Sequence, residues 1–267
     1  MLVKRAVAFL DILGFRKLVT ETPLSELGPR FANVIEAVRR DLNRPPLPGE
    51  NLHRLLKDRP LTEPFCLTYA FSDSVILISD DSSSTGCLAV LVFAVRAMQA
   101  MMASGFPVRA GVSFGEMFVD IPRAVFLGRA LTTAYDSEQS QDWVGGLVDD
   151  TVAEAVPELA KYTASNMLLN TLFPVYPVPL KTGTVRECRT LNWRWNLVVK
   201  SGTRSLFHET SDPEAMKKIT NALAYAKWIR AAGLAYPADP ASVPVEVRRF
   251  FVGDELPPPS YIHGDEW

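Results

Sequence analysis

Apolar runs separated by polar turns fill the first half of the chain and predict alternating strands and helices. The first run, Val3–Leu10, is apolar enough to form a buried strand, and Gly14 allows a sharp turn after it. Apolar side chains then recur at helical spacing over residues 31–42, and Pro45-Pro46 is expected to end that helix. The polar stretch 47–63 is expected to be a loop.

Two short β-prone runs follow. Phe65–Phe71 and Val75–Ser79 flank Ser72-Asp73-Ser74, which predicts a hairpin with an acidic residue at its tip. The nearly continuous apolar stretch at 87–103 is shorter than the roughly 20 residues that a bilayer requires, and it contains Arg96. We interpret it as a buried helix and not as a membrane span.

The next segments predict the rest of a sheet. Residues 108–114 alternate and indicate a strand with one glycine-rich face, and Glu116–Asp120 is expected to be its hairpin partner. Residues 128–141 predict a helix, 146–148 a short strand, and 149–156 a last helix capped by two aspartates. The order predicts an α+β fold with antiparallel hairpins and helices on one side of the sheet.

Beyond residue 157 the pattern changes. Phe173–Lys181 is extended and proline-spaced, and apolar residues alternate with polar ones over residues 191–197, which indicates a half-buried strand. Ser211-x-x-Glu214 is a capping box that predicts a helix running to Gly233.

Composition narrows the class of protein. The 267 residues include 28 basic and 30 acidic side chains, so the net charge of −2 favours neither nucleic acid nor a membrane surface as a partner. Cys66, Cys87 and Cys188 are odd in number and far apart, and the three histidines lack metal-ligand spacing. No signal peptide is evident at the start, so we expect a cytoplasmic location.

Two acidic residues carry the candidate chemistry. Asp11 ends the first apolar run, where an ionised carboxylate is costly unless it is paired. A divalent cation and the N-terminus of the next helix are both possible partners. If the first two β-runs are neighbours, Asp11 and Asp73 can converge on Mg²⁺ or Mn²⁺ held against a nucleoside triphosphate. Backbone N–H groups of the turn at residues 13–15, with Arg16 and Lys17 nearby, would then face the phosphates.

Four motifs in this order resemble those of class III nucleotide cyclases. They are Phe9-x-Asp11-Ile12-x-Gly14-Phe15, Ser72-Asp73, Arg109-x-Gly111-Val112-x-x-Gly115, and Gly128-x-x-Leu131-Thr132-x-Ala134-Tyr135-Asp136-x-Glu138. The resemblance implies a ferredoxin-like α+β fold and a head-to-tail homodimer. It also implies a catalytic domain over residues 1–157, followed by a C-terminal extension over residues 158–267 packed on the same unit.

The resemblance also implies the site residues, with Mn²⁺ or Mg²⁺ as cofactor. The implied metal ligands are Asp11, Ile12 and Asp73. The implied substrate contacts are Gly14, Phe15, Arg16, Tyr69 and Val125, and the implied catalytic residues are Arg109 and Thr132.

Two departures bear on the base. Tyr69 stands where purine cyclases of this family have a base-reading lysine, and Val125 stands where they have a base-reading aspartate. A drier and smaller pocket favours a pyrimidine, and the pattern resembles the pyrimidine cyclases of bacterial Pycsar anti-phage defence. That implies UTP, with CTP second, as substrate and a cyclic-nucleotide-gated effector downstream. Alternatively, Tyr69 is a strand residue that packs on a helix.

Two further departures leave other functions open. Thr132 and Asp136 stand where the family has an asparagine and an arginine that contact phosphate. Arg109, Arg123 and Arg129 are candidates to replace that arginine, although a structural or solvated role is the better interpretation for any one of them. A non-catalytic nucleotide sensor is therefore a second hypothesis. An interaction module, built from the Trp193/Trp195 segment and the proline-rich tail, is a third.

Overall fold

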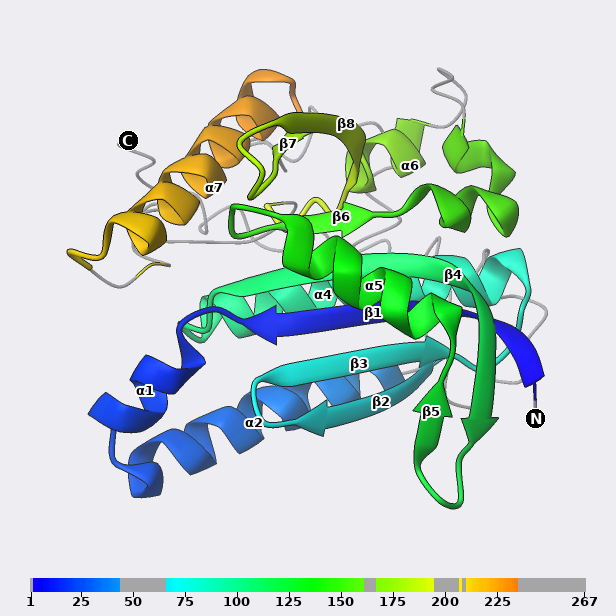
Figure 1. The fold of residues 1–267 in the computed structure, drawn as a ribbon, viewed down its shortest axis with the longest axis horizontal. Helices are drawn as coiled ribbons and strands as arrows, with labels where there is room; N and C mark the ends of the chain where they lie inside the picture. The colour runs from blue at the N-terminus through cyan, green and yellow to red at the C-terminus, as the bar shows by residue number, and fades with distance from the viewer. Residues whose placement is uncertain (1, 44–65, 161–166, 195–206, 208–209, 235–267) are drawn as a thin grey trace, which may run out of the picture.

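The computed structural model describes residues 2–43, 66–160, 167–194, 207 and 210–234. Its centre is an eight-stranded sheet in the order β2-β3-β1-β4-β6-β8-β7, with β5 paired to the end of β4 (Figure 1). All pairs are antiparallel except β4 with β6. The strands are β1 (Leu2–Ile12), β2 (Cys66–Phe71), β3 (Ser74–Ser79), β4 (Val108–Asp120), β5 (Val125–Leu127), β6 (Gly146–Val148), β7 (Val175–Pro179) and β8 (Val185–Thr190).

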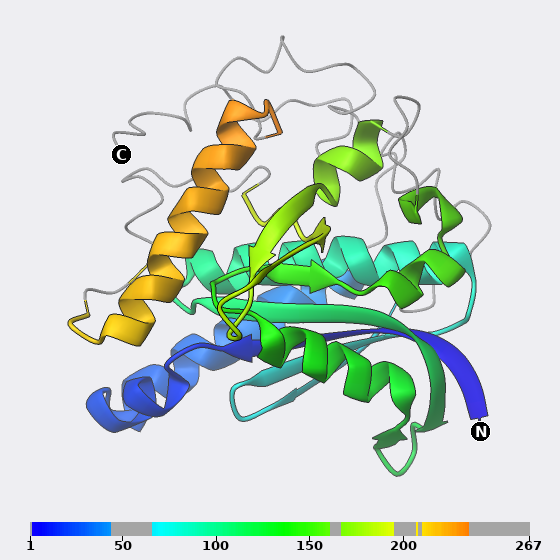
Figure 2. The same ribbon diagram turned by 45° about the horizontal axis from the view of Figure 1, so that its top comes forward.

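Helices cover both faces of this sheet. Helices α2 and α4 lie behind it in Figure 1, and α5 crosses in front of β4 and β1. Helix α1 continues from the end of β1, while α7 runs along the β7–β8 end (Figure 2). The bounds are α1 (Phe15–Glu21), α2 (Leu24–Asn43), α4 (Ser84–Ala103), α5 (Arg129–Ser140), α6 (Met167–Leu172) and α7 (Pro213–Ala231).

Strand β1 is apolar on both faces because both faces are covered. Ala8 and Leu10 belong to the large core shared with α2 and α4, whereas Val7 faces a smaller cluster under α5. Asp11 has the same parity as Val7 along the strand and therefore also lies on the α5 face.

The predicted buried helix is confirmed as α4. Ser83 caps its N-terminus by accepting a hydrogen bond from the N–H of Gly86, and most of its side chains are buried. In the described part of the chain, α4 alone is long and apolar enough to cross a bilayer, but 72% of its most apolar window is buried inside the fold. It forms part of the core here.

The extension adds to the same sheet and core. Strand β8 pairs with β6, and Tyr225 of α7 packs edge-on against Trp143 at 4.8 Å. Trp143 also stacks on Tyr176 of β7 at 5.5 Å between ring centroids. These rings join α7 to the residues that follow α5.

The α+β class is confirmed, as are the strand at β1, the β2–β3 hairpin and helices α2 and α5. One detail differs, because α5 lies on the opposite face from α2 and α4. The glycine-rich face of β4 explains the difference: a Cβ on Gly111 would lie 2.1 Å from the carbonyl oxygen of Ala134, so α5 rests directly on the strand.

Four local predictions are wrong. Residues 116–120 continue β4, and its hairpin partner is β5. Residues 150–154 form a 3₁₀ turn capped by Asp149 and not an α-helix. The cap of α7 is Asp212 and not Ser211. Residues 191–194 are not in a strand, because the strand that pairs with β6 is the more polar β8. The loop at 47–63, Pro45-Pro46, residues 195–197 and the proline-rich tail lie outside the described residues.

Replacing Gly111 with alanine is expected to destabilise the protein by about 1–3 kcal/mol, because the new methyl group overlaps the backbone of α5. Urea denaturation followed by circular dichroism measures this. Gly28→Ala is the control, since Gly28 lies in exposed helix with open space around it and should gain about 0.5–1 kcal/mol. An unchanged midpoint for Gly111→Ala would contradict the close α5–β4 contact.

Candidate active site

Strand pairing brings Asp11 and Asp73 to the same end of the sheet. Asp11 pairs across β1 with Ser74 of β3, the residue after Asp73. The N–H of Ile12 donates a hydrogen bond of 3.0 Å to the carbonyl oxygen of Asp73, which fixes the hairpin tip against the end of β1. Ser72 adopts a positive φ of 55° to make this tight turn. The two carboxylates therefore arise from backbone positions that are held together.

The electrostatics at this end of the sheet favour a bound cation. The pKa of Asp11 is raised to about 6, first by burial and then by the negative charges of Glu138 and Asp73. Two neighbouring carboxylates suit Mg²⁺ or Mn²⁺, which take oxygen ligands and often complete their shell with substrate phosphates. The described residues include no group of three or more Asp, Glu, His or Cys side chains that could hold a metal ion. A metal ion at Asp11 and Asp73 would therefore need substrate phosphates as further ligands.

The alternative role for Asp11, as a helix cap, is not observed. Helix α1 has Gly14 at its N-cap, and no side chain makes the capping hydrogen bond there. Gly14 has a φ of 75°, a conformation that favours glycine, and it turns the chain sharply out of β1. Asp11 is thus left without a structural partner of this kind.

Arg109 lies beside Asp11, but its guanidinium is already engaged. It pairs with Asp11 across the β1–β4 ladder and forms a fully buried ion pair with Glu138 near the end of α5. Its Nη1 also donates to the carbonyl oxygen of Gln141 at 3.1 Å. The second oxygen of Glu138 accepts from Gln139 at 2.7 Å. Arg109 therefore joins α5 to β4 behind the two aspartates.

Lys181 is a residue near the site that the sequence patterns did not indicate. It begins the turn between β7 and β8, and its N–H donates to the carbonyl oxygen of Ser140 at 2.9 Å. The positive charge of Lys181 lowers the pKa of Asp11. The pKa of Lys181 is itself lowered, mainly by burial, although the negative charge of Glu138 partly offsets that effect. Lys181 is exposed, so its amine is accessible to a phosphate. Only the pairing of β7 with β8, which is not evident from the sequence, places it there.

The turn after β1 exposes backbone N–H groups and basic side chains to solvent, whereas the Phe15 ring packs inward. Phe15 packs on Phe31 of α2, with centroids 5.7 Å apart. Arg16 is exposed, and Lys17 lies 3.9 Å from Glu21 in an exposed ion pair. A substrate here would meet the N–H groups after Gly14 and the side chain of Arg16.

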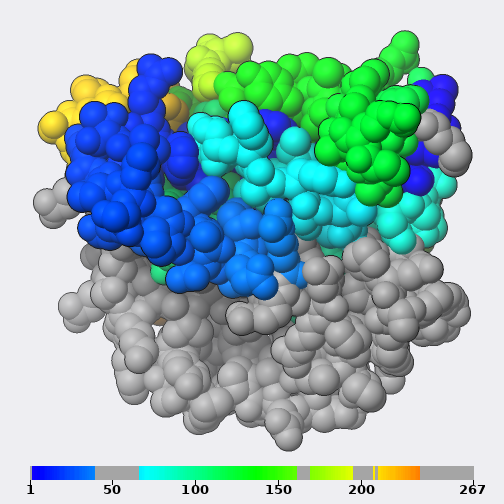
Figure 3. Space-filling view, turned by 90° about the horizontal axis from the view of Figure 1, so that it is seen from below, coloured from blue at the N-terminus to red at the C-terminus, as the bar shows by residue number. Residues whose placement is uncertain are grey.

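An apolar platform lies one pleat before Asp11 on the same face. Phe9, Ile76 and Tyr69 are direct cross-strand neighbours on β1, β3 and β2. Tyr69 contacts Phe126 of β5, with centroids 4.4 Å apart, and Phe9 contacts Tyr135 of α5 at 5.3 Å. In Figure 3 the β2–β3 hairpin lies between α1 and the arm formed by β4 and β5.

Phe126, and not Val125, faces the platform. Side chains alternate along β5, so Val125 is on the other side of the strand and is 39% exposed. The hydroxyl of Tyr69 has no hydrogen-bond partner within the described part of the chain. Burial raises the pKa of this hydroxyl. The platform therefore offers ring surfaces and one hydroxyl group.

Thr132 and the remaining arginines lie elsewhere. Helix α5 runs in the same direction as β1 (Figure 1). Glu138 near its end therefore lies close to Asp11, whereas Thr132 is in the first turn with Ala130, which contacts Gly115. The Thr132 hydroxyl donates to the carbonyl oxygen of Arg129 at 3.0 Å. Arg123 pairs with Asp120 at 2.8 Å in the β4–β5 turn. One chain does not bring these groups to the two aspartates.

Trp193 does not form a partner surface. Its side chain is fully buried in the main core, where its ring lies 6.1 Å from that of Tyr225. Trp195, the other tryptophan of the interaction-module hypothesis, lies outside the described residues. That hypothesis therefore loses its main support.

No protein-family model and no curated protein matches the chain. Among solved structures, it is similar to the catalytic core of a rhodopsin-guanylyl cyclase with converted specificity in complex with ATPalphaS. The identity is 10%, the TM-score is 0.47, and the match covers 72% of this chain and 97% of that one.

Two other solved structures are similar. For a bacterial light-regulated adenylyl cyclase the identity is 14% and the TM-score 0.44, covering 72% of this chain and 92% of that one. The third structure is the non-canonical dimeric guanylyl cyclase domain of the RhoGC fusion protein of the aquatic fungus Blastocladiella emersonii. Its identity to this chain is 12% and the TM-score is 0.45, and the match covers 71% of this chain and 96% of that one. Similarity this low leaves the activity to be judged from the chain's own residues.

Asp11→Asn is expected to raise Tm at pH 7.5 without metal by a few degrees, because it removes a half-buried charge repelled by Glu138 and Asp73. The folded pKa lies above the unfolded value, so wild-type stability falls as pH rises from about 4 to 6. The advantage of the variant should therefore vanish near pH 4. Thermal melts across this pH range measure it.

Added Mn²⁺ should raise the Tm of wild type and not of Asp11→Asn. Glu36→Gln, an exposed change on α2, should behave as wild type. Equal stabilisation of all three proteins by Mn²⁺ would place the metal elsewhere.

Proposed function

We propose that this protein is a nucleotide cyclase that converts a pyrimidine nucleoside triphosphate, UTP in preference to CTP, into the 3′,5′-cyclic nucleotide and pyrophosphate. The convergence of Asp11 and Asp73 beside the Gly14 turn carries the proposal. Two neighbouring carboxylates, of which Asp11 has a raised pKa, lie next to backbone N–H groups and basic side chains and suit a metal-bound triphosphate.

Each group has a role in binding or orientation. Asp11, Ile12 and Asp73 would hold Mn²⁺ or Mg²⁺, which would supply Lewis-acid stabilisation at the reacting phosphate. The N–H groups after Gly14, together with Arg16 and Lys181, would bind the phosphates and stabilise the leaving pyrophosphate. The ribose 3′-oxygen would lose its proton to solvent and form a bond to the α-phosphorus, while the bond from that phosphorus to the pyrophosphate oxygen opposite it breaks.

The platform formed by Phe9, Ile76 and Tyr69 would hold the base. A pyrimidine ring can stack there against Phe126, and the Tyr69 hydroxyl can hydrogen-bond its exocyclic oxygen or amine. Among the described residues, those that form the platform, Phe9, Ile76 and Tyr69 with Phe126 beside them, carry no acidic or basic group to read a purine edge. This absence supports a pyrimidine over a purine.

A second copy of the chain would complete the site. Thr132 and Arg129 in the first turn of α5, and Arg123 in the β4–β5 turn, lie at the opposite end of β1 from Asp11, so a head-to-tail homodimer would be needed to bring them to the site. Beyond catalysis, we propose that the product gates an effector in anti-phage defence. We also propose that residues 158–267 are an extension of the catalytic domain that provides Lys181.

A catalytically impaired nucleotide sensor is the second candidate. One observation favours it: Arg109 is committed to Glu138 and Gln141, and Asp136 stands where an arginine would stabilise the transition state. The sensor would bind a metal–triphosphate complex without forming product. Calorimetry of UTP binding in the presence of Mn²⁺, run beside the turnover assay, separates the two candidates.

Incubation of the purified full-length chain with each of the four ribonucleoside triphosphates and Mn²⁺ is expected to yield cyclic UMP first and cyclic CMP second, detected by mass spectrometry. Asp11→Ala and Asp73→Ala should each lower turnover by about 10³-fold or more, since each removes a ligand of the metal. Asp150→Ala, a surface carboxylate paired with Arg186, is the control and should retain activity.

Cyclic purine products would overturn the base assignment. No cyclic product from any triphosphate, with UTP binding retained, would favour the sensor. Full activity of Asp11→Ala would remove both proposals.

Lys181→Gln is expected to raise KM for the triphosphate roughly tenfold, because the exposed amine, whose charge acts on Asp11 and Glu138, would no longer offset phosphate charge. Lys181→Arg should largely restore binding. Lys227→Gln, an exposed change on α7, should leave the steady-state constants unchanged. Unaltered kinetics in Lys181→Gln would show that the extension does not contact the phosphates.

A further inference from the structure

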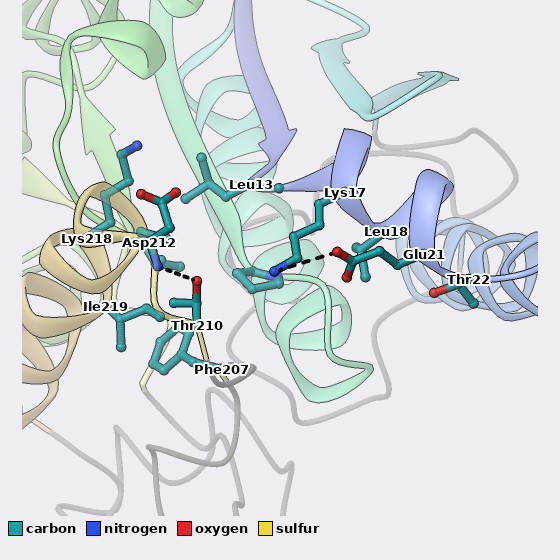
Figure 4. A pocket seen from close by; sticks show the side chains of 14 residues that line it. Leu13, Lys17, Leu18, Glu21, Thr22, Phe207, Thr210, Asp212, Lys218 and Ile219 are labelled. Atoms are coloured by element: carbon teal, nitrogen blue, oxygen red, sulfur yellow. Dashed lines mark hydrogen bonds and ion pairs between the residues drawn. The ribbon is translucent and has the colours of Figure 1, made fainter.

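A cavity separates α1 from the first turns of α7. It has a volume of about 600 Å³, within the range of small-molecule sites, and it opens beside the Gly14 turn. Its walls are mainly apolar, from Leu13, Leu18, Val144, Phe207 and Ile219. Figure 4 shows α1 on one side and α7 on the other, with Lys17 and Lys218 on opposite walls.

The cavity lining carries two amines, of Lys17 and Lys218, and two carboxylates, of Glu21 and Asp212, and both carboxylates already have partners. Lys218 is half-buried and has no ion pair with any residue that the structure describes. Lys17 has only the weak exposed pair with Glu21 at 3.9 Å. Asp212 is committed, because its carboxylate accepts the N–H of Glu214 as the cap of α7. An entering anion would therefore find two amines it can reach.

We propose that this cavity is a second ligand site, distinct from the nucleotide site, for a small organic anion with an apolar body. The apolar part packs on Leu13, Val144 and Ile219, and the anionic group lies between Lys17 and Lys218. A ligand of this class uses both features of the cavity, the apolar walls and the two amines.

The position of the cavity makes it a site of regulation. Gly14 lines it and also forms the turn beside Asp11. Helix α7 is fixed to the segment after α5 by Lys217, which pairs with the buried Asp142 at 2.6 Å, and by Asn221, which donates to the Asp142 carbonyl at 2.7 Å. The neighbouring Gln141 accepts from Arg109. A ligand that changes the spacing between α1 and α7 would therefore act on the Gly14 turn beside Asp11 and, through α7, on the segment that contacts Arg109.

Binding is tested with 8-anilino-1-naphthalene sulfonate, an aromatic ring system with one sulfonate, by fluorescence titration of the full-length protein. Wild type is expected to bind one equivalent. Ala215→Trp, which fills the cavity, should abolish binding, and Lys218→Gln should weaken it roughly tenfold. Lys227→Gln, on an exposed position of the same helix, should bind as wild type.

Circular dichroism establishes whether each variant is folded. If Ala215→Trp does not fold, Lys218→Gln alone tests whether the probe binds in this cavity. Failure of wild type to bind, equal binding by Lys218→Gln, or competitive displacement of the probe by UTP with Mn²⁺ would each overturn the inference. The titration needs no turnover, so a protein that binds the probe but forms no cyclic nucleotide would refute the proposed activity and leave this site standing.

Discussion

The candidate site at the end of β1 depends on one backbone hydrogen bond, from the N–H of Ile12 to the carbonyl oxygen of Asp73. Because β1 and β3 are antiparallel neighbours, the tip of the β2–β3 hairpin lies at the level where β1 ends. The hydrogen bond fixes that level, and the turn at Gly14 then carries the chain away from the sheet. Two aspartates far apart in the sequence thereby lie at the same end of the sheet, close enough for the charge of Asp73 to raise the pKa of Asp11.

This arrangement crowds negative charge, and the surrounding residues offset only part of it. Glu138 is the third carboxyl group near Asp11, and its ion pair with Arg109 neutralises it inside the core. Lys181 contributes a further positive charge from the extension. The raised pKa of Asp11 shows that repulsion and burial still dominate. A fold that keeps two acidic groups together at a cost in stability is typical of a site that binds a cation.

Periodicity and turn chemistry were sufficient to predict β1, the hairpin and α4, and through them the meeting of Asp11 with Asp73. These features depend on local signals: apolar runs, Gly14, and a short polar turn. The face occupied by α5 could not be predicted, because it depends on how closely a helix approaches Gly111. Strand β8 is too polar to stand out, and with it Lys181 was missed. Phe126 was missed for a similar reason, since the parity of β5 is set by its pairing with β4.

The position of a bound metal ion decides most directly whether Asp11 and Asp73 act together. A crystal of the protein with Mn²⁺ and a non-reactive UTP analogue, measured at the manganese absorption edge, locates the ion by its anomalous signal. We expect a single anomalous peak within coordination distance of two carboxylate oxygens, one from Asp11 and one from Asp73 of the same chain. The triphosphate should lie beside Gly14. A peak that contacts only one of the two aspartates, or neither, would contradict this expectation.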